Sequence, residues 1–143
     1  MEEKKEILEI FPSAYLKFSD TIRLFYVNNA QKVEELGLKP GDAQFLHFLC
    51  DFQGLNQSEL CNIYGLSKSR MSEMISALEN KGLIIRKMNP DNRRVFHINL
   101  TDEGIIKVEK IRNLFNRYCK NCLRDFTQEE VNILESLLMR FKE

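Results

Sequence analysis

Two short groups of basic and hydroxyl side chains give this sequence its clearest chemistry. The first is Ser67-Lys68-Ser69-Arg70, and the second is Arg93-Arg94. A guanidinium group binds a phosphate or the edge of a guanine through paired hydrogen bonds, and lysine and serine side chains bind phosphate oxygens. Such residues suit a protein surface that contacts duplex DNA at two places.

The first group is expected at the exposed start of a helix, and the second at the exposed tip of a hairpin. Two short helical patterns meet at Tyr64-Gly65-Leu66-Ser67, where Gly65 suits a left-handed helix end and Ser67 suits the cap of the next helix. Residues 83–87 and 95–101 then read as two strands of a hairpin. The order of helix, tight turn, helix and hairpin is that of a winged helix-turn-helix.

The DNA-binding residues are expected on the first turns of the second of these helices and at the hairpin tip. Arg70 is the expected base-reading side chain, because an arginine there can address a guanine with two hydrogen bonds. The serines and Lys68 suit phosphate contacts, and the arginines of the tip suit a second contact with the duplex. The alternative for both groups is an ordinary solvated surface. The predicted DNA-binding set is Ser67, Lys68, Ser69, Arg70, Ser72, Glu73, Asp91, Arg93 and Arg94.

The charge of the chain is balanced overall but not along its length. Its 21 lysines and arginines equal its 21 aspartates and glutamates, so the formal net charge is zero. Between Ser67 and Leu100, however, seven basic residues outnumber three acidic ones, whereas up to Leu66 six basic residues face ten acidic ones. The positive excess falls on the predicted DNA-binding segment, where attraction to phosphate is useful.

Six helices and one hairpin are expected, which gives a mainly α fold with a small β wing, in the α+β class. Apolar residues at three- and four-residue steps indicate helices at residues 8–33, 42–52, 56–64, 67–81, 102–122 and 127–141. Four helices therefore precede the two strands, and two helices follow them. Pro12 is expected near the start of the first helix, because proline is best tolerated in a first turn. Asn56-Gln57-Ser58-Glu59 and Thr127-Gln128-Glu129-Glu130 match the capping box that begins a helix.

The apolar stripes of the first and last helices are too long for so small a domain to cover. A single domain over residues 1–143 is expected, with dimerisation helices at 1–36 and 102–143 and a DNA-binding lobe at 41–101. The stripes are expected to pack against a second copy in a homodimer. No apolar run approaches the ~18 residues of a membrane span, and the charged start is unlike a signal peptide. We therefore expect a cytoplasmic protein with no membrane partner.

The hairpin and its approach resemble the MarR family of bacterial transcription regulators, the multiple-antibiotic-resistance type. The resemblance rests on the helix order and on Leu78-Glu79-Asn80-Lys81-Gly82-Leu83-Ile84, which leads into the hairpin. It rests above all on Asp91-Asn92-Arg93-Arg94 followed by Leu100-Thr101. It covers nearly the whole chain. It implies a dimer built from the first, fifth and sixth helices, with the fourth helix in the major groove of a pseudo-palindromic operator and the hairpin tip in the minor groove.

The resemblance also implies roles for single residues and for a ligand. Arg93 would be the minor-groove residue, and Asp91 would orient that arginine or the backbone of the hairpin. Family members usually repress their own gene and a neighbouring one. Many release DNA when a small phenolic or other lipophilic compound binds between the dimer helices and the DNA-binding lobe. The expected function is that of a dimeric, ligand-responsive repressor.

An aromatic stripe on two of the helices gives a candidate lining for a ligand cavity. Its members are Tyr15, Phe18, Phe25, Phe45 and Phe48. Rings at helical spacing also suit a protein core or a dimer interface, so both readings stay open.

The four cysteines are Cys50, Cys61, Cys119 and Cys122. They are expected to be reduced thiols without a structural disulfide. Cys122 on an apolar stripe and Cys61 at a helix crossing suit packing. A metal site needs several convergent ligands, and His47 and His97 are the only histidines. No metal or cofactor is expected, but a thiol- or metal-responsive regulator of the same fold stays an alternative.

Two further classes of function differ from DNA binding in the residues that they need. The sequence has no glycine-rich phosphate loop, no Gly-x-Ser-x-Gly and no His-Glu-x-x-His, so an enzyme is not expected. A winged-helix module that binds protein through the same helix and hairpin is the other alternative. Basic side chains at both places favour DNA, because a protein-docking wing would more often expose apolar residues.

Overall fold

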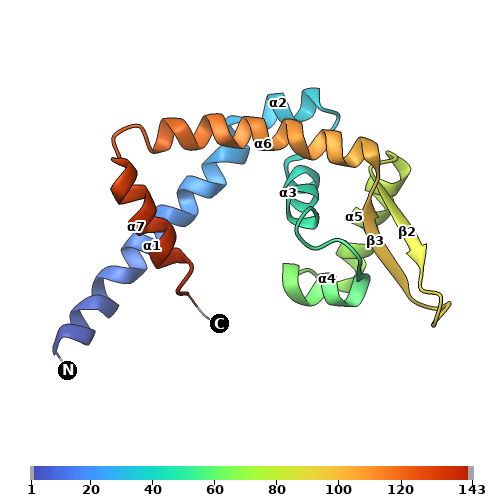
Figure 1. The fold of residues 1–143 in the computed structure, drawn as a ribbon, viewed down its shortest axis with the longest axis horizontal. Coiled ribbons are helices and arrows are strands. Elements are labelled where there is room, and N and C mark those ends of the chain that lie inside the picture. Colours follow the sequence, from blue (N-terminus) through green and yellow to red (C-terminus); the bar gives the residue numbers. More distant parts are fainter. Residues whose placement is uncertain (1, 142–143) are drawn as a thin grey trace.

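The chain forms helices around a small sheet in a computed structural model that describes residues 2–141, with side-chain environments for residues 13–141. The described elements are α1 (Glu2–Asn28), α2 (Ala30–Glu35), α3 (Pro40–Leu49), β1 (Leu55–Asn56), α4 (Gln57–Tyr64), α5 (Lys68–Asn80), β2 (Ile84–Met88), β3 (Phe96–Leu100), α6 (Asp102–Cys122) and α7 (Gln128–Leu138). Helices α3 to α5 and the sheet gather near one end of α6, and α7 crosses α1 near the other end (Figure 1). We call residues 40–100 the wing lobe. The predicted mainly α fold with a β wing is confirmed.

The first predicted helix is divided in the structure. Asn29 leaves the helical conformation, with φ −111° and ψ 12°, and its Nδ2 donates a hydrogen bond of 2.8 Å to Phe25 O. The prediction that the helix begins near Pro12 is wrong, because α1 begins at Glu2 and continues through this proline. A proline removes one backbone hydrogen bond, but the Glu- and Lys-rich segment before it has high helix propensity. The side chains of Leu8 and Phe11 lie outside the described residues.

Two helices begin at their predicted capping boxes. Asn56 Oδ1 accepts from Ser58 N and Glu59 N at 2.9 and 3.0 Å, and Glu59 Oε2 accepts from Asn56 N at 2.7 Å. Thr127 and Glu130 form the same reciprocal pair at the start of α7. Pro40 stands at the start of α3, where its missing N–H is not needed, so this helix begins before the predicted residue 42 and ends at Leu49.

The sheet has three strands in the order β1-β3-β2, all antiparallel. The predicted hairpin is present, with Ile84 opposite Leu100 and Met88 opposite Phe96. The short strand β1, which pairs with β3, was not predicted. A strand of two residues is too short to show an alternating pattern. Its pairing ties the start of α4 to the wing.

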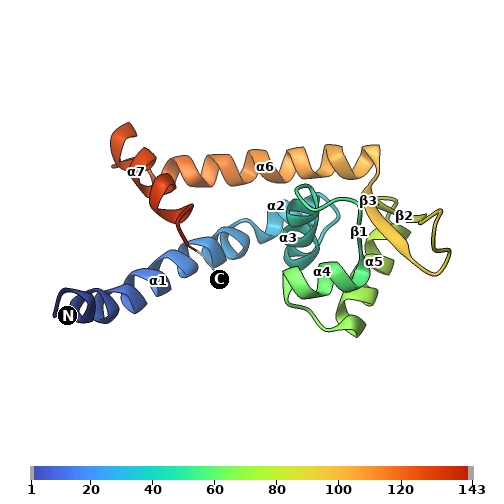
Figure 2. The same cartoon turned by 60° about the horizontal axis from the view of Figure 1, so that its bottom comes forward.

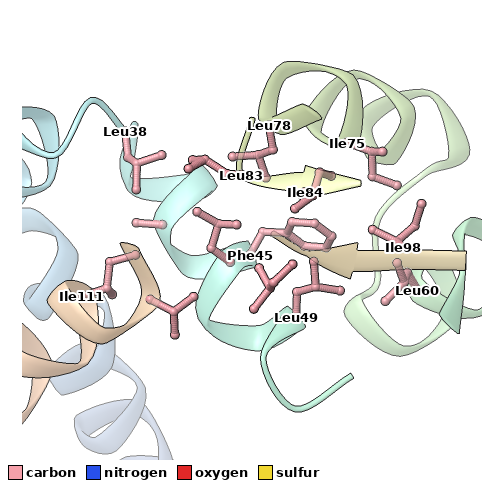
Figure 3. Close-up of a cluster of buried hydrophobic side chains, with 14 of the residues drawn as sticks. Leu38, Phe45, Leu49, Leu60, Ile75, Leu78, Leu83, Ile84, Ile98 and Ile111 are labelled. Carbon is pink, nitrogen blue, oxygen red and sulfur yellow. The ribbon is translucent and has the colours of Figure 1, made fainter. Parts of the chain in front are cut away.

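The hydrophobic core lies inside the wing lobe and reaches α6. Phe45 of α3 is fully buried and is surrounded by Leu49, Leu60, Ile75 and Ile98 in the close-up of Figure 3. Val108, Ile111 and Leu114 bring one face of α6 onto this core. Ile105 and Cys122, which fit the same predicted stripe, are exposed at the two ends of α6.

Helix α6 joins the sheet through a close backbone contact. Thr101 N donates to Leu83 O at 3.1 Å, and Thr101 Oγ1 both donates to Gly82 O and accepts from Gly104 N. A Cβ atom at Gly104 would overlap Leu83 O. Only glycine allows α6 to start this near β2, so the direction of α6 is fixed relative to the wing.

The other end of α6 packs on α1 through aromatic residues. Tyr118 Oη donates to Thr21 O at 2.8 Å, and the ring of Phe25 meets Phe115 edge to face at a centroid distance of 5.1 Å. Both views of the fold show α1 and α6 diverging beyond this contact toward α7 (Figure 2). The terminal helices α1, α6 and α7 therefore extend away from the wing lobe.

The terminal helices leave apolar side chains exposed. Between α1 and α7 lies a groove of about 580 Å³ lined by Ala14, Tyr15, Phe18, Leu134, Leu137, Leu138 and Phe141. Leu137 is 48% exposed and Tyr15 is 58% exposed, although both are large apolar side chains. Within the described part of the chain, no helix is both long enough and apolar enough to span a membrane.

Candidate nucleic-acid interface

The turn between α4 and α5 fixes the start of α5. Gly65 ends α4 in the left-handed conformation, with φ 76° and ψ 27°, as predicted. Ser67 caps α5 by accepting a hydrogen bond from Arg70 N at 3.4 Å. Gln57 of α4 donates to Lys68 O at 3.2 Å, which ties the first turn of α5 to the start of α4. These contacts make the helix-turn-helix that the sequence predicts.

One face of α5 is buried and the opposite face is open. Met71, Ile75 and Leu78 are fully buried in the wing-lobe core. Residues 67–70 and Glu73 are exposed, and Ser72 is half-buried. Among the described residues, the side chains of Lys68 and Arg70 make no ion pair, so both cations are available to a partner. Ser69 Oγ donates to Glu73 Oε1 at 3.3 Å, a contact that limits the positions of this carboxylate.

The wing tip is held by asparagine side chains. Asn89 Oδ1 accepts from Asp91 N at 2.8 Å, and Asn92 Oδ1 accepts from Arg94 N at 3.1 Å. Main-chain bonds from Asn89 N to Val95 O and from Val95 N to Asn92 O close the turn, each at 2.9 Å. Two local side-chain bonds of this kind give a polar turn a defined backbone.

The wing arginines project from this fixed turn. Arg93 and Arg94 are exposed, and neither guanidinium is engaged in an ion pair within the part of the chain that the structure describes. Asp91 was expected to orient Arg93 or the wing backbone. Across residues 13–141, its carboxylate forms no hydrogen bond or ion pair with Arg93. The turn is ordered by Asn89 and Asn92 instead, and sequence reasoning gave these two residues no role.

Arg86 connects the base of the wing to α5. Its Nη2 donates to Ser76 Oγ at 2.9 Å, and its Nε lies 3.1 Å from Glu79 Oε2 in an ion pair that is not aligned as a hydrogen bond. The side chain is half-buried rather than directed to solvent. Arg86 therefore sets the position of the wing relative to α5, and no local sequence pattern signals such a contact.

A second set of contacts anchors β3 on its other side. His97 Nδ1 lies 2.7 Å from Gly54 O, and Gln53 Oε1 accepts from Leu100 N at 3.0 Å. Gly54 N also donates to Ile98 O at 2.9 Å. Residues 53–56 thus form hydrogen bonds along the length of β3. These bonds join α4, α5 and the wing into one rigid unit. His97 is a structural residue of the wing.

The five aromatic residues expected near a ligand cavity do not form one cluster. Phe25 and Phe45 are fully buried, and Phe48 stacks on Phe52 at a centroid distance of 4.5 Å. Tyr15 and Phe18 lie in the separate groove between α1 and α7.

Another groove, of about 610 Å³, lies between α1 and α3 and is lined by Ser19, Ile22, Arg23, Tyr26, Val27, Ala30, Pro40 and Gln44. Burial, and to a smaller extent nearby Tyr64, raises the pKa of Tyr26 to about 12. Tyr26 therefore keeps its hydroxyl proton at neutral pH. Arg23 is 3.1 Å from Asp20, so the charge on this groove is already partly balanced.

All four cysteines are free thiols. Cys61 is buried at the contact of α4 with the core, as expected for packing. Cys122 was expected to pack against other apolar residues, but in the structure it is exposed. The half-buried cysteine of α6 is Cys119. No group of three or more His, Cys, Asp or Glu side chains in the described region is placed to hold a metal ion.

The fold and the exposed basic surface define a winged helix-turn-helix protein. The model of the MarR family matches residues 36–95, from just after α2 to the wing turn. HTH-type transcriptional repressor MdtR of Bacillus subtilis (strain 168) is 32% identical over 71% of this chain and 65% of its own length. HTH-type transcriptional regulator YhbI of the same strain is 30% identical over 77% of this chain and 71% of its own length.

Solved structures agree with the sequence relatives. A MarR family transcriptional regulator from Listeria monocytogenes, complexed with a 26mer DNA, has a TM-score of 0.76 and 26% sequence identity. That match covers 88% of this chain and 84% of the other. This chain belongs to the MarR family. It covers less than two thirds of several curated relatives, including 65% of MdtR and 63% of a regulatory protein for the hcr operon of Thauera aromatica.

Proposed function

We propose that this protein is a dimeric DNA-binding regulator that represses transcription, including that of its own gene. The observation that carries the proposal is a pair of basic surfaces on one rigid lobe. The start of α5 exposes Lys68 and Arg70, and the wing tip exposes Arg93 and Arg94. Both backbones are fixed by local hydrogen bonds, while the charged groups themselves are left for a partner.

In this proposal α5 enters the major groove through its first two turns. Arg70 reads a guanine edge, and Lys68 with the serines at 67, 69 and 72 binds phosphates. The N-terminus of α5 adds a partial positive charge toward these phosphates. Glu73, whose carboxylate is held by Ser69, can accept from the amino group of a cytosine. The negative charge of Glu73 also disfavours any DNA position that would bring a phosphate close to this side chain.

The wing tip contacts the minor groove beside the same half-site. Arg93 occupies a narrow groove, where the potential of an A·T-rich sequence is most negative, and Arg94 binds the adjoining backbone. Asp91 lies at the start of the turn, and its backbone N–H is bonded to Asn89. We assign the Asp91 carboxylate no phosphate contact, because its negative charge would repel a phosphate.

The dimer forms through the terminal helices. The groove between α1 and α7 exposes a large apolar surface, which is costly in water unless a partner covers it. A second copy covers it through the same helices in a two-fold arrangement, because homodimers of this kind use one surface twice. Two wing lobes then reach two half-sites, roughly 34–36 Å apart on one side of the duplex.

A small lipophilic or phenolic ligand regulates the protein by binding in the groove between α1 and α3. The lining of this groove is mainly apolar, and Arg23 and Tyr26 supply the polar groups that could orient a phenol or a carboxylate. The groove lies between a terminal helix and the wing lobe. A ligand there would change the angle between the two parts of the molecule without touching the DNA surface.

The proposal is tested by anisotropy with a duplex from upstream of the gene and a scrambled duplex, at two salt concentrations. We expect salt-dependent binding and a preference for the upstream duplex. Arg93→Ala is expected to weaken specific binding by about 1–3 kcal/mol, or roughly 5- to 150-fold. Arg124→Ala is the matched control, because Arg124 is exposed in the turn after α6 and pairs only with Asp125 among the described residues. Equal affinity of the Arg93→Ala and Arg124→Ala proteins would refute the assignment of the wing.

The dimer is tested separately by sedimentation. Leu137→Glu places a charge in the groove between α1 and α7, and it should shift the protein toward monomer. Ser136→Glu is its control, because position 136 lies on the opposite face of α7 from Leu134 and Leu138. Dimers of unchanged stability in the Leu137→Glu protein would contradict the proposed interface.

A further inference from the structure

Two thiols at the end of α6 have no part in the proposed DNA surface. Cys119 and Cys122 are three residues apart in the last turns of α6, so their side chains share one face of the helix. Side chains at this spacing have Cβ atoms roughly 5–6 Å apart. Cys119 is half-buried, Cys122 is exposed, and both are reduced. The pair is therefore open to solvent on one side.

The surroundings of the pair bring a third polar group close. Tyr118 Oη donates to Thr21 O of α1 at 2.8 Å. Partial burial raises the pKa of Tyr118, and the nearness of Cys122 and then of Cys119 raises it further. Burial, followed by the nearness of Cys122, raises the pKa of Cys119. The two cysteines thus share one face of α6, beside the contact between α1 and α6.

These properties select among the reagents that act on thiols. The raised pKa of Cys119 disfavours its thiolate, which is the form of a cysteine that reacts with peroxides. Zinc prefers a complete set of four ligands, and the described residues offer no group of three or more suitable side chains. A trivalent arsenical with one organic substituent needs only two sulfur ligands to complete its bonding, and sulfur is a soft ligand that suits it.

We propose that Cys119 and Cys122 form a dithiol site that chelates organic arsenicals of the type R–As(OH)₂. Two As–S bonds form and two As–O bonds break, while each thiol proton leaves with one hydroxide as water. Arsenic stays trivalent, so no oxidant or reductant takes part. Holding both thiols in one helix makes the second bond intramolecular, which favours the chelate over two separate thiol adducts.

The test uses the full chain in its reduced form and phenylarsine oxide as the probe. After removal of unbound probe into excess glutathione, intact-mass analysis should show one phenylarsenic group per chain. Dithiothreitol should release it, because only a dithiol can compete with a chelate. Cys119→Ser and Cys122→Ser should each lose the retained group, and the Cys50→Ser control should keep it. Retention by either of the first two variants, or loss by the control, would overturn the proposal.

A second measurement makes the test independent of the variants. In the wild-type chain, the bound probe should protect Cys119 and Cys122 together from alkylation by iodoacetamide, as read by peptide mapping. Unchanged alkylation of these two cysteines, or protection of Cys50 instead, would contradict the assignment. No DNA is present in either experiment, so this site and the proposed regulatory function can fail separately.

Discussion

Replacing Gly104 by alanine tests whether the joint between α6 and the wing is as close as the structure has it. The new Cβ would overlap Leu83 O, and it would lie 3.0 Å from Leu83 C and 3.3 Å from Leu100 Cδ2. The first two atoms are backbone, so α6 or β2 must move. Overpacking of this kind costs about 1–3 kcal/mol, and movement of Leu83 O also endangers its bond with Thr101 N, worth about 1 kcal/mol.

Alanine has a higher helix propensity than glycine, and this difference adds about 1 kcal/mol to the unfolding free energy. The net expectation is a loss of about 1–3 kcal/mol in unfolding free energy, or roughly 2–4 °C in Tm for each kcal/mol at this chain length. Urea unfolding at equal protein concentration measures it, because the stability of the proposed dimer would depend on concentration. Gly41→Ala is the matched control: it lies in the first turn of α3 with open space around it, so its stability should be unchanged or higher. A Gly104→Ala protein as stable as the Gly41→Ala protein would refute the close contact.

Three further perturbations test the lobe itself. Arg86→Met should weaken operator binding with little change in its salt dependence, because Arg86 positions the wing through Ser76 and Glu79; a reduced salt slope in the anisotropy assay would instead indicate a phosphate contact. Asn56→Ala should lower the unfolding free energy by about 1 kcal/mol through loss of the capping box, whereas alanine at exposed Asn62 in the same helix should not. Burial first, and then Arg112, lowers the pKa of His47, so the unfolded chain binds more protons in acid. Unfolding free energy should therefore fall as pH drops below about 6.5, and His47→Gln should flatten this dependence; parallel pH curves for the two proteins would contradict it.

The parts of the fold that were predictable are those with a local signal. Gly65 and Ser67 marked the turn before α5, because a left-handed helix end and a serine cap each favour particular residue types. The hairpin was predictable from alternating apolar residues, such as Ile98 and Leu100, on either side of a polar turn. Each of these features depends on residues close together in the chain.

The parts that were missed depend on residues far apart in the chain. β1 exists because Leu55 and Asn56 pair with β3, some forty residues later. The break at Asn29 depends on where α2 must turn to reach α3, and the hydropathy pattern runs through it. The contact of Arg86 with α5 has no local signal in the sequence, because only the folded lobe brings Ser76 and Glu79 beside it.

One set of contacts makes the wing lobe rigid, and another set fixes the position of this lobe relative to the terminal helices. Within the wing lobe, Arg86 fixes β2 to α5, and residues 53–56 fix β3 to α4, so the spacing between the start of α5 and the wing tip is set by one lobe. The position of the lobe relative to the terminal helices is set elsewhere, by Gly104 at one end of α6 and by Tyr118 with Phe25 at the other. In the proposed dimer, a ligand or a substitution at the α1–α6 contact would therefore alter the distance between the two lobes while leaving each lobe able to bind a half-site. Such a change should lower affinity for a two-half-site operator far more than affinity for a single half-site.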